Sequence, residues 1–192
     1  GILKHCSLAN AEKLGALGER FLNKQQPSLE AQIGNLADEI AYNNHDVDDG
    51  LRSGLITLEQ LSEVQIFARH LAEVRAKYPA LQGRRVVTET VRRIINTLVI
   101  DLVNTTRMNI LSSGVQTIAD VRAAPPLAAF SPALLDEHRE LKRFLHRHLY
   151  RHYKVARMSS KAGRIISDLY TAFTGDARLL PPEHQERESL EG

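Results

Sequence analysis

Three side chains that could do chemistry, Asp38, Tyr42 and Asp46, follow one another at intervals of four residues. In a helix this spacing places them on one face, spread over about 12 Å of the axis. Two carboxylates and a phenol in a row could serve a metal ion, a phosphate and a sugar hydroxyl. We therefore take this face as the leading candidate for a functional site.

The segment around these residues is predicted to be one amphipathic helix. Ser28, which follows Pro27, suits an N-cap, and Gly50 suits a helix end. The helix should bury an apolar stripe with helical spacing. This stripe consists of Leu29, Ile33, Leu36, Ala37 and Ile40. The three candidate residues lie roughly opposite it, so an ordinary solvated acidic face is the alternative interpretation.

Residues 28–32 (Ser-Leu-Glu-Ala-Gln) and 37–51 resemble the last metal-ligand helix of the HD-domain deoxynucleoside triphosphate triphosphohydrolases, the dGTPase-like proteins. Residues 141–162, which include Tyr150-Arg151-His152, are similar to the basic helix in the C-terminal half of that family. Residues 1–5 resemble the stretch after the family's third metal ligand. The matches occur in the family's order and cover most of the chain.

The resemblance implies a hydrolase that converts a dNTP into a deoxynucleoside and triphosphate, with a divalent metal, Mg²⁺ or alternatively Mn²⁺. In this family a His, a His-Asp pair and a distant Asp hold the metal, and the match places that Asp at Asp38. Tyr42 matches a tyrosine that packs on the deoxyribose and contacts phosphate. Asp46 matches the carboxylate that accepts a hydrogen bond from the sugar 3′-hydroxyl, and Lys4 a lysine that meets the phosphates. The implied assembly is a homo-oligomer, commonly a hexamer.

The chain departs from the family pattern in the residues before Asp38. The pattern there would be one His and, after it, a separate His-Asp pair, and this combination is missing. His45 and Asp46 look like such a pair, but adjacent helical side chains diverge by about 100°. We interpret the chain as a fragment that would be inactive alone, since one carboxylate cannot hold a catalytic ion. Residues 1–54 would end the HD phosphohydrolase domain, and residues 55–192 would form a C-terminal helical region.

Composition is that of an ordinary globular protein, with 43% hydrophobic and 25% charged residues among 192. The one cysteine, Cys6, excludes an internal disulfide and suits a reducing compartment. No apolar run reaches about 18 residues, and no signal-peptide pattern opens the chain. We therefore expect a cytoplasmic protein that has no membrane partner.

Every strong periodic signal in the chain predicts helix, so we expect an all-α helical bundle without strands. A capping box at Thr57 should open a helix that runs to about Tyr78. Residues 84–113 should form a long, largely buried helix closed by Gly114. Ser131 and Pro132 should open a basic helix that extends past Tyr153.

The basic helix is the second candidate feature. Residues 139–164 carry nine Lys and Arg against the single acid Glu140, although the net charge of the whole chain is only +2. A patch containing Arg147, Arg151 and Lys154 would attract a substrate triphosphate, a regulatory nucleotide or single-stranded nucleic acid. A solvated helix that pairs with acidic neighbours is the plainer interpretation. The alternative function is thus a non-catalytic helical module that binds nucleotide or single-stranded nucleic acid.

Overall fold

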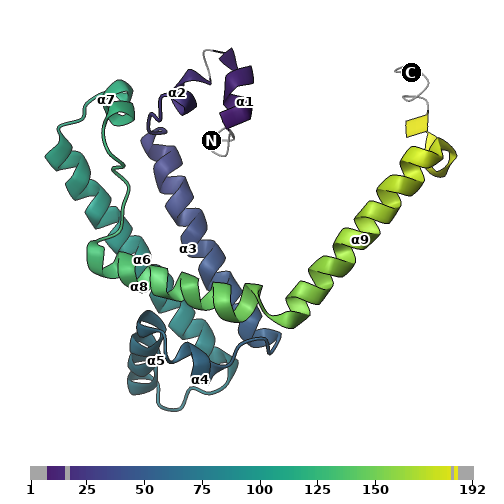
Figure 1. Ribbon diagram of the computed structural model, residues 1–192. Coiled ribbons are helices and arrows are strands. Elements are labelled where there is room, and N and C mark those ends of the chain that lie inside the picture. Colours follow the sequence, from purple (N-terminus) through teal and green to yellow (C-terminus); the bar gives the residue numbers. More distant parts are fainter. Residues whose placement is uncertain (1–7, 16–17, 183, 186–192) are drawn as a thin grey trace. The chain divides into compact units, whose positions relative to one another are not determined.

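The computed structural model describes residues 8–15, 18–182, 184 and 185, and Figure 1 shows that this part of the chain is built from helices. No strand occurs among these residues, so the predicted all-α class is confirmed. Within them, no helix is long and apolar enough to cross a membrane. The chain divides into two compact units, the first ending at Leu145 and the second beginning at His146.

The first unit is organised around four helices of the eight described in it. The helices of this unit are α1 (Leu8–Lys13), α2 (Glu19–Leu22), α3 (Leu29–Arg52), α4 (Leu58–Leu61), α5 (Gln65–Lys77), α6 (Arg84–Ser113), α7 (Ile118–Ala123) and α8 (Pro132–Leu145). Helices α3 and α5 each contact both α6 and α8. The core lies between these four helices, where Val47, Phe67, Leu98 and Leu141 are completely buried. Each such side chain contributes about 1.5–3 kcal/mol through burial.

Helix α6 has the predicted bounds, Arg84–Ser113, and ends as expected at Gly114, whose φ of 68° and ψ of 12° are left-handed. Its buried residues recur at every fourth position, so they form one row along the helix. The row is Val86, Thr90, Ile94, Leu98, Leu102 and Thr106. Val99, Ile100 and Val103 are exposed, so the expectation of a largely buried helix was wrong for the opposite face.

The predicted helix from Thr57 to Tyr78 is instead two helices, α4 and α5. The capping box is present, because Thr57 Oγ1 accepts a hydrogen bond from Gln60 N and Gln60 Oε1 accepts one from Thr57 N. The chain then turns at Val64, which is buried in an extended conformation. Gln65 N donates to Glu140 Oε2 of α8 at 3.0 Å. This carboxylate satisfies an N–H at the start of α5, so a tertiary contact supports a second helix start that periodicity cannot reveal.

The predicted single basic helix is also interrupted. Helix α8 begins at Pro132 as expected but ends at Leu145, and the second unit contains a π-helical turn, η3 (His146–Tyr150), then α9 (Tyr153–Gly175) and the short η4 (Ala177–Leu179). His152 has an extended backbone, and its Nδ1 accepts a hydrogen bond from Lys154 N at 3.3 Å. The expectation that one helix passes Tyr153 was therefore wrong, because His152 caps a new helix there.

Candidate functional site

Helix α3 carries the three candidate residues on the side away from the core. Asp38 is exposed, Tyr42 is 66% exposed, and Asp46 is half-buried. Ile40 and Val47 of the same helix are buried in the core. The structure therefore brings the three residues together on one accessible face, as their spacing predicts.

The buried side of α3 differs from the predicted apolar stripe. Ile33 is 38% exposed and Ala37 is also exposed, whereas Gln32, Asn43 and Asn44 are buried. The expectation that the whole stripe faces the core was thus wrong. The helix also continues two residues past Gly50, which is itself buried, to Arg52.

Polar contacts explain why α3 is rotated in this way. Gln32 Oε1 accepts hydrogen bonds from Leu127 N at 2.8 Å and Ala128 N at 3.2 Å, and Gln32 Nε2 donates to Pro27 O at 3.1 Å. Asn44 Nδ2 donates to Ile40 O at 2.7 Å within the helix. Because a buried polar group without a partner is costly, the bonds from Gln32 Oε1 to the distant backbone at Leu127 and Ala128 hold this side of α3 inward. Asp38 and Tyr42 are consequently turned outward.

A polar cluster from α3 and α8 adjoins the candidate face. His138 of α8 is only 2% exposed, and its Nε2 lies 3.2 Å from Glu39 Oε1 and 3.4 Å from Asn43 Nδ2. Lys142 Nζ donates to the same Glu39 oxygen at 2.7 Å. Glu39 directly follows Asp38 in the sequence, so this cluster fixes the part of α3 that presents Asp38. We refer to Glu39, Asn43, His138 and Lys142 as the His138 cluster.

The pKa values in the His138 cluster follow from burial and from its charges. Burial lowers the pKa of His138, although the Glu39 carboxylate acts to raise it. Burial acts to raise the pKa of Glu39, but the hydrogen bonds and charges of Lys142 and His138 together lower it. The folded state therefore favours a neutral imidazole beside an ionised carboxylate.

The His138 cluster is absent from the sequence interpretation. Its residues are separated by about a hundred positions, so their pairing depends on how α8 packs against α3. Its signal in the sequence is limited to two four-residue spacings, Glu39 to Asn43 on α3 and His138 to Lys142 on α8, which do not show that the two helices meet.

The other predicted site residues lie apart from α3 in the chain. Lys4 is outside the described residues. Arg147 is in η3, Arg151 is in the turn before α9, and Lys154 is in the first turn of α9; all three are exposed. Within the described part of the chain, no three His, Cys, Asp or Glu residues come together in a group that could hold a metal ion.

Comparisons with known proteins point to one family. A family model described as a phosphohydrolase-associated domain matches residues 128–192. The chain is 82% identical over 192 residues to the deoxyguanosinetriphosphate triphosphohydrolase-like protein of Thiobacillus denitrificans, covering 100% of this chain and 51% of the relative. For the proteins of the same name from Ralstonia nicotianae and Nitrosomonas europaea, identity is 62% over 188 residues and 53% over 187. These alignments cover 98% and 97% of this chain and 49% and 50% of the relatives, so the chain spans about half the length of the curated relatives it matches.

Burial of neutral His138 predicts a pH-dependent stability. As the pH falls through the ordinary histidine pKa of about 6.5, the His138 imidazole binds a proton in the unfolded state but not yet in the folded state. Acidification therefore favours unfolding. The free energy of unfolding of the wild type should fall between about pH 7.5 and about pH 5.5. In His138→Gln this fall should be smaller by up to about 1.4 kcal/mol. Urea unfolding at both pH values measures the difference. His45→Gln, an exposed histidine of α3, is the control and should leave the loss unchanged. An equal loss in His138→Gln and wild type would contradict the assignment.

Proposed function

Because the chain belongs to the deoxyguanosinetriphosphate triphosphohydrolase-like family, we propose that it is part of a hydrolase that cleaves a deoxynucleoside triphosphate to a deoxynucleoside and triphosphate. The observation that carries this proposal is the outward face of α3, where Asp38, Tyr42 and Asp46 are held together by the buried opposite side of the helix. As the resemblance implies, the protein would be a cytoplasmic homo-oligomer, commonly a hexamer.

Asp38 would supply one carboxylate to the divalent ion, Mg²⁺ or alternatively Mn²⁺. Its exposed carboxylate suits an oxygen-preferring cation. The described residues do not complete a site for the ion, since no group of three ligands is present among them. The remaining ligands would therefore have to lie outside the described part of the chain.

Tyr42 and Asp46 would select the sugar. The exposed ring of Tyr42 offers an apolar surface on which a deoxyribose can pack, and its hydroxyl can donate to a phosphate oxygen. One turn further along α3, the Asp46 carboxylate can accept a hydrogen bond from the 3′-hydroxyl. Lys4 would contact the phosphates, as the resemblance implies.

Several acids of α3 would repel a triphosphate if they were unpaired, and three of them have basic partners. Lys142 pairs with Glu39 at 2.7 Å, Arg84 with Asp48 at 3.4 Å, and Arg52 with Asp49 at 2.9 Å. These pairs reduce the negative charge around the candidate face. We propose that they make α3 compatible with an anionic substrate.

The exposed basic residues of the second unit support a second function, the binding of nucleotide or single-stranded nucleic acid. Tyr150 is 42% exposed and Tyr153 is 58% exposed, so both aromatic rings are accessible among the arginines and lysines. An aromatic ring beside a cationic surface suits base stacking with phosphate contacts. Arg147, Arg151 and Lys154 would supply those contacts.

The role of Asp38 can be tested in a chimera in which this chain replaces the matching half of the Thiobacillus denitrificans relative. Asp38→Ala should abolish release of inorganic triphosphate from dGTP and other dNTPs and reduce bound Mn²⁺, because a methyl group cannot replace a carboxylate ligand. Asp49→Ala removes another exposed acid of α3 and should retain activity. Normal turnover by the Asp38→Ala chimera would remove this residue from the site.

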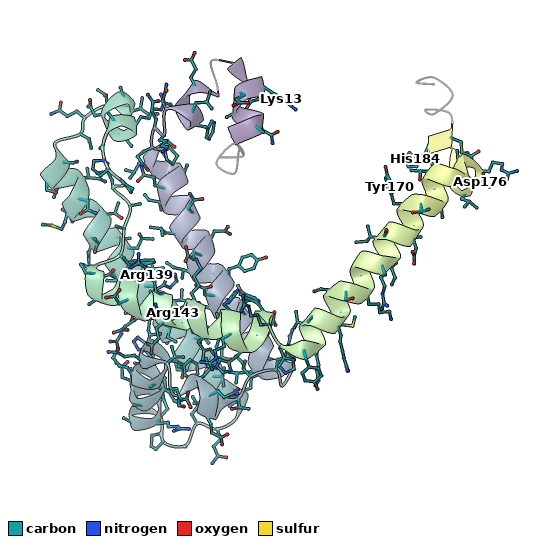
Figure 2. All side chains as sticks on the ribbon, viewed as in Figure 1. Lys13, Arg139, Arg143, Tyr170, Asp176 and His184 are labelled. Atoms are coloured by element: carbon teal, nitrogen blue, oxygen red, sulfur yellow. The ribbon has the colours of Figure 1, made fainter. Side chains whose placement is uncertain are left out.

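The basic residues make a separate prediction about salt. A triple variant in which Arg147, Arg151 and Lys154 are all changed to Gln should bind dNTP or a fluorescent oligonucleotide more weakly. The salt dependence of this binding should also be flatter, since fewer counterions are released. Titrations at two ionic strengths measure both quantities. Replacing Arg139 and Arg143, the exposed α8 arginines labelled in Figure 2, with Gln removes two positive charges outside the proposed contacts and should change affinity and salt slope less. If the triple variant keeps the wild-type affinity and salt slope, these three residues are solvated surface.

A further inference from the structure

Helix α9 carries an uncovered apolar stripe along its whole length. Six apolar residues follow one another at alternating intervals of three and four positions, which is the a and d spacing of a coiled coil. They are Val155, Met158, Ala162, Ile165, Leu169 and Ala172. Met158 is 63% exposed, Ile165 47% and Leu169 48%, and no residue of α9 is buried. Figure 2 shows the side chains along α9, with Tyr170 labelled near its C-terminal end.

We propose that α9 pairs antiparallel with α9 of a second copy of this chain. The helix has 23 residues and is thus about 34 Å long, which allows three heptads to overlap. In the register of full overlap, Val155 lies opposite Ala172 of the second copy. Met158 then lies opposite Leu169, and Ala162 opposite Ile165. This interface does not depend on the proposed hydrolase activity.

The sizes of the stripe residues favour the antiparallel orientation. With antiparallel helices, each alanine faces a larger residue, because Ala162 meets Ile165 and Ala172 meets Val155. With parallel helices in register, Ala162 would face Ala162 and Ala172 would face Ala172. Two of the six layers would then be thin, and thin layers leave voids that cost stability. Side-chain volume is therefore spread more evenly along the antiparallel pair than along the parallel one.

Charge complementarity selects the same orientation. Asp168 is the only acid in α9, whereas the four bases Lys154, Arg157, Lys161 and Arg164 all precede it. Lys161 and Asp168 both occupy the g position beside the stripe, and g positions face each other in antiparallel pairs. Lys161 therefore meets Asp168 of the second copy, and the symmetry of the pair makes this contact twice. Parallel helices would instead place the basic ends side by side.

Neighbouring residues of one helix cannot produce this pairing. Lys161 and Asp168 are seven residues apart, about 10.5 Å along the axis, so they do not meet within one copy. Each reversal, Lys161→Asp or Asp168→Lys, would replace two attractions in the dimer with two repulsions. An equimolar mixture of the two variants would restore attraction at both contacts, but only between unlike chains.

Sedimentation velocity on the whole chain, over a concentration series from low micromolar to submillimolar, tests the interface. We expect a concentration-dependent dimer whose Kd is weakened roughly tenfold or more by either reversal, since both Lys161–Asp168 contacts change from attraction to repulsion. The mixture and the double variant should both recover wild-type affinity. Arg157→Asp makes the same charge change as Lys161→Asp away from the stripe and should have a smaller effect. Ile165→Glu, which places carboxylates in the central layers, should abolish the dimer.

Circular dichroism of each variant is the control for folding. Helix content should be retained, which would separate loss of the dimer from loss of the fold. A chain that stays monomeric throughout the series overturns the proposal and leaves the stripe to another segment or partner. A dimer that Ile165→Glu and both reversals leave intact overturns it as well. Weakening by the reversals without recovery in the mixture would contradict the antiparallel orientation.

Discussion

The rotation of α3 about its own axis is the constraint on which the candidate site depends. Ile40 and Val47 bury one side of the helix in the core, while Gln32 is bonded to the backbone at Leu127 and Ala128. A rotation by one residue position, about 100°, would bury charged groups and break these bonds. The accessible position of Asp38, Tyr42 and Asp46 is thus set by the opposite side of the helix, whose interactions are unrelated to substrate.

The His138 cluster links this rotation to α8. Its buried imidazole and the Lys142 ammonium share one carboxylate oxygen of Glu39, so α8 is held against the turn of α3 that carries Asp38. Burial favours the neutral imidazole, and the nearby ammonium maintains the ionised carboxylate. The same interactions therefore contribute to stability and reduce negative charge beside the proposed metal ligand. Glu39 thus contributes both to the packing of α8 on α3 and to the charge around the three candidate residues.

The features that the sequence could predict are those determined by nearby residues. The bounds of α6 follow from its apolar periodicity and from Gly114, and the capping box at Thr57 was recognisable from four residues. The features that could not be predicted depend on tertiary contacts. Glu140 supports a second helix start at Gln65, and buried amides on α3 replace part of the expected apolar stripe. The break at His152 is an exception, because it depends on a local histidine cap and histidine is not among the residues that usually cap helices.

The candidate site shows the same division. Helical spacing placed Asp38, Tyr42 and Asp46 on one face, and family resemblance suggested their roles, which remain predictions. Sequence periodicity could not identify the His138 cluster, because its two helices are brought together only by the fold. The apolar stripe of α9 is not among the features predicted from the sequence, and its exposure is a property of the structure.

The most direct measurement of the central claim is sugar selectivity in the chimera with the Thiobacillus denitrificans relative. The ratio of kcat/KM for dGTP to that for 2′,3′-dideoxyguanosine triphosphate reports whether a group accepts the 3′-hydroxyl. If Asp46 is that group, Asp46→Asn should reduce the ratio by about tenfold or more, because a charge-assisted hydrogen bond is lost. Asp49→Asn, on the same helix, should leave it unchanged. An unchanged ratio in an active Asp46→Asn chimera would contradict the assignment of this α3 face to the substrate.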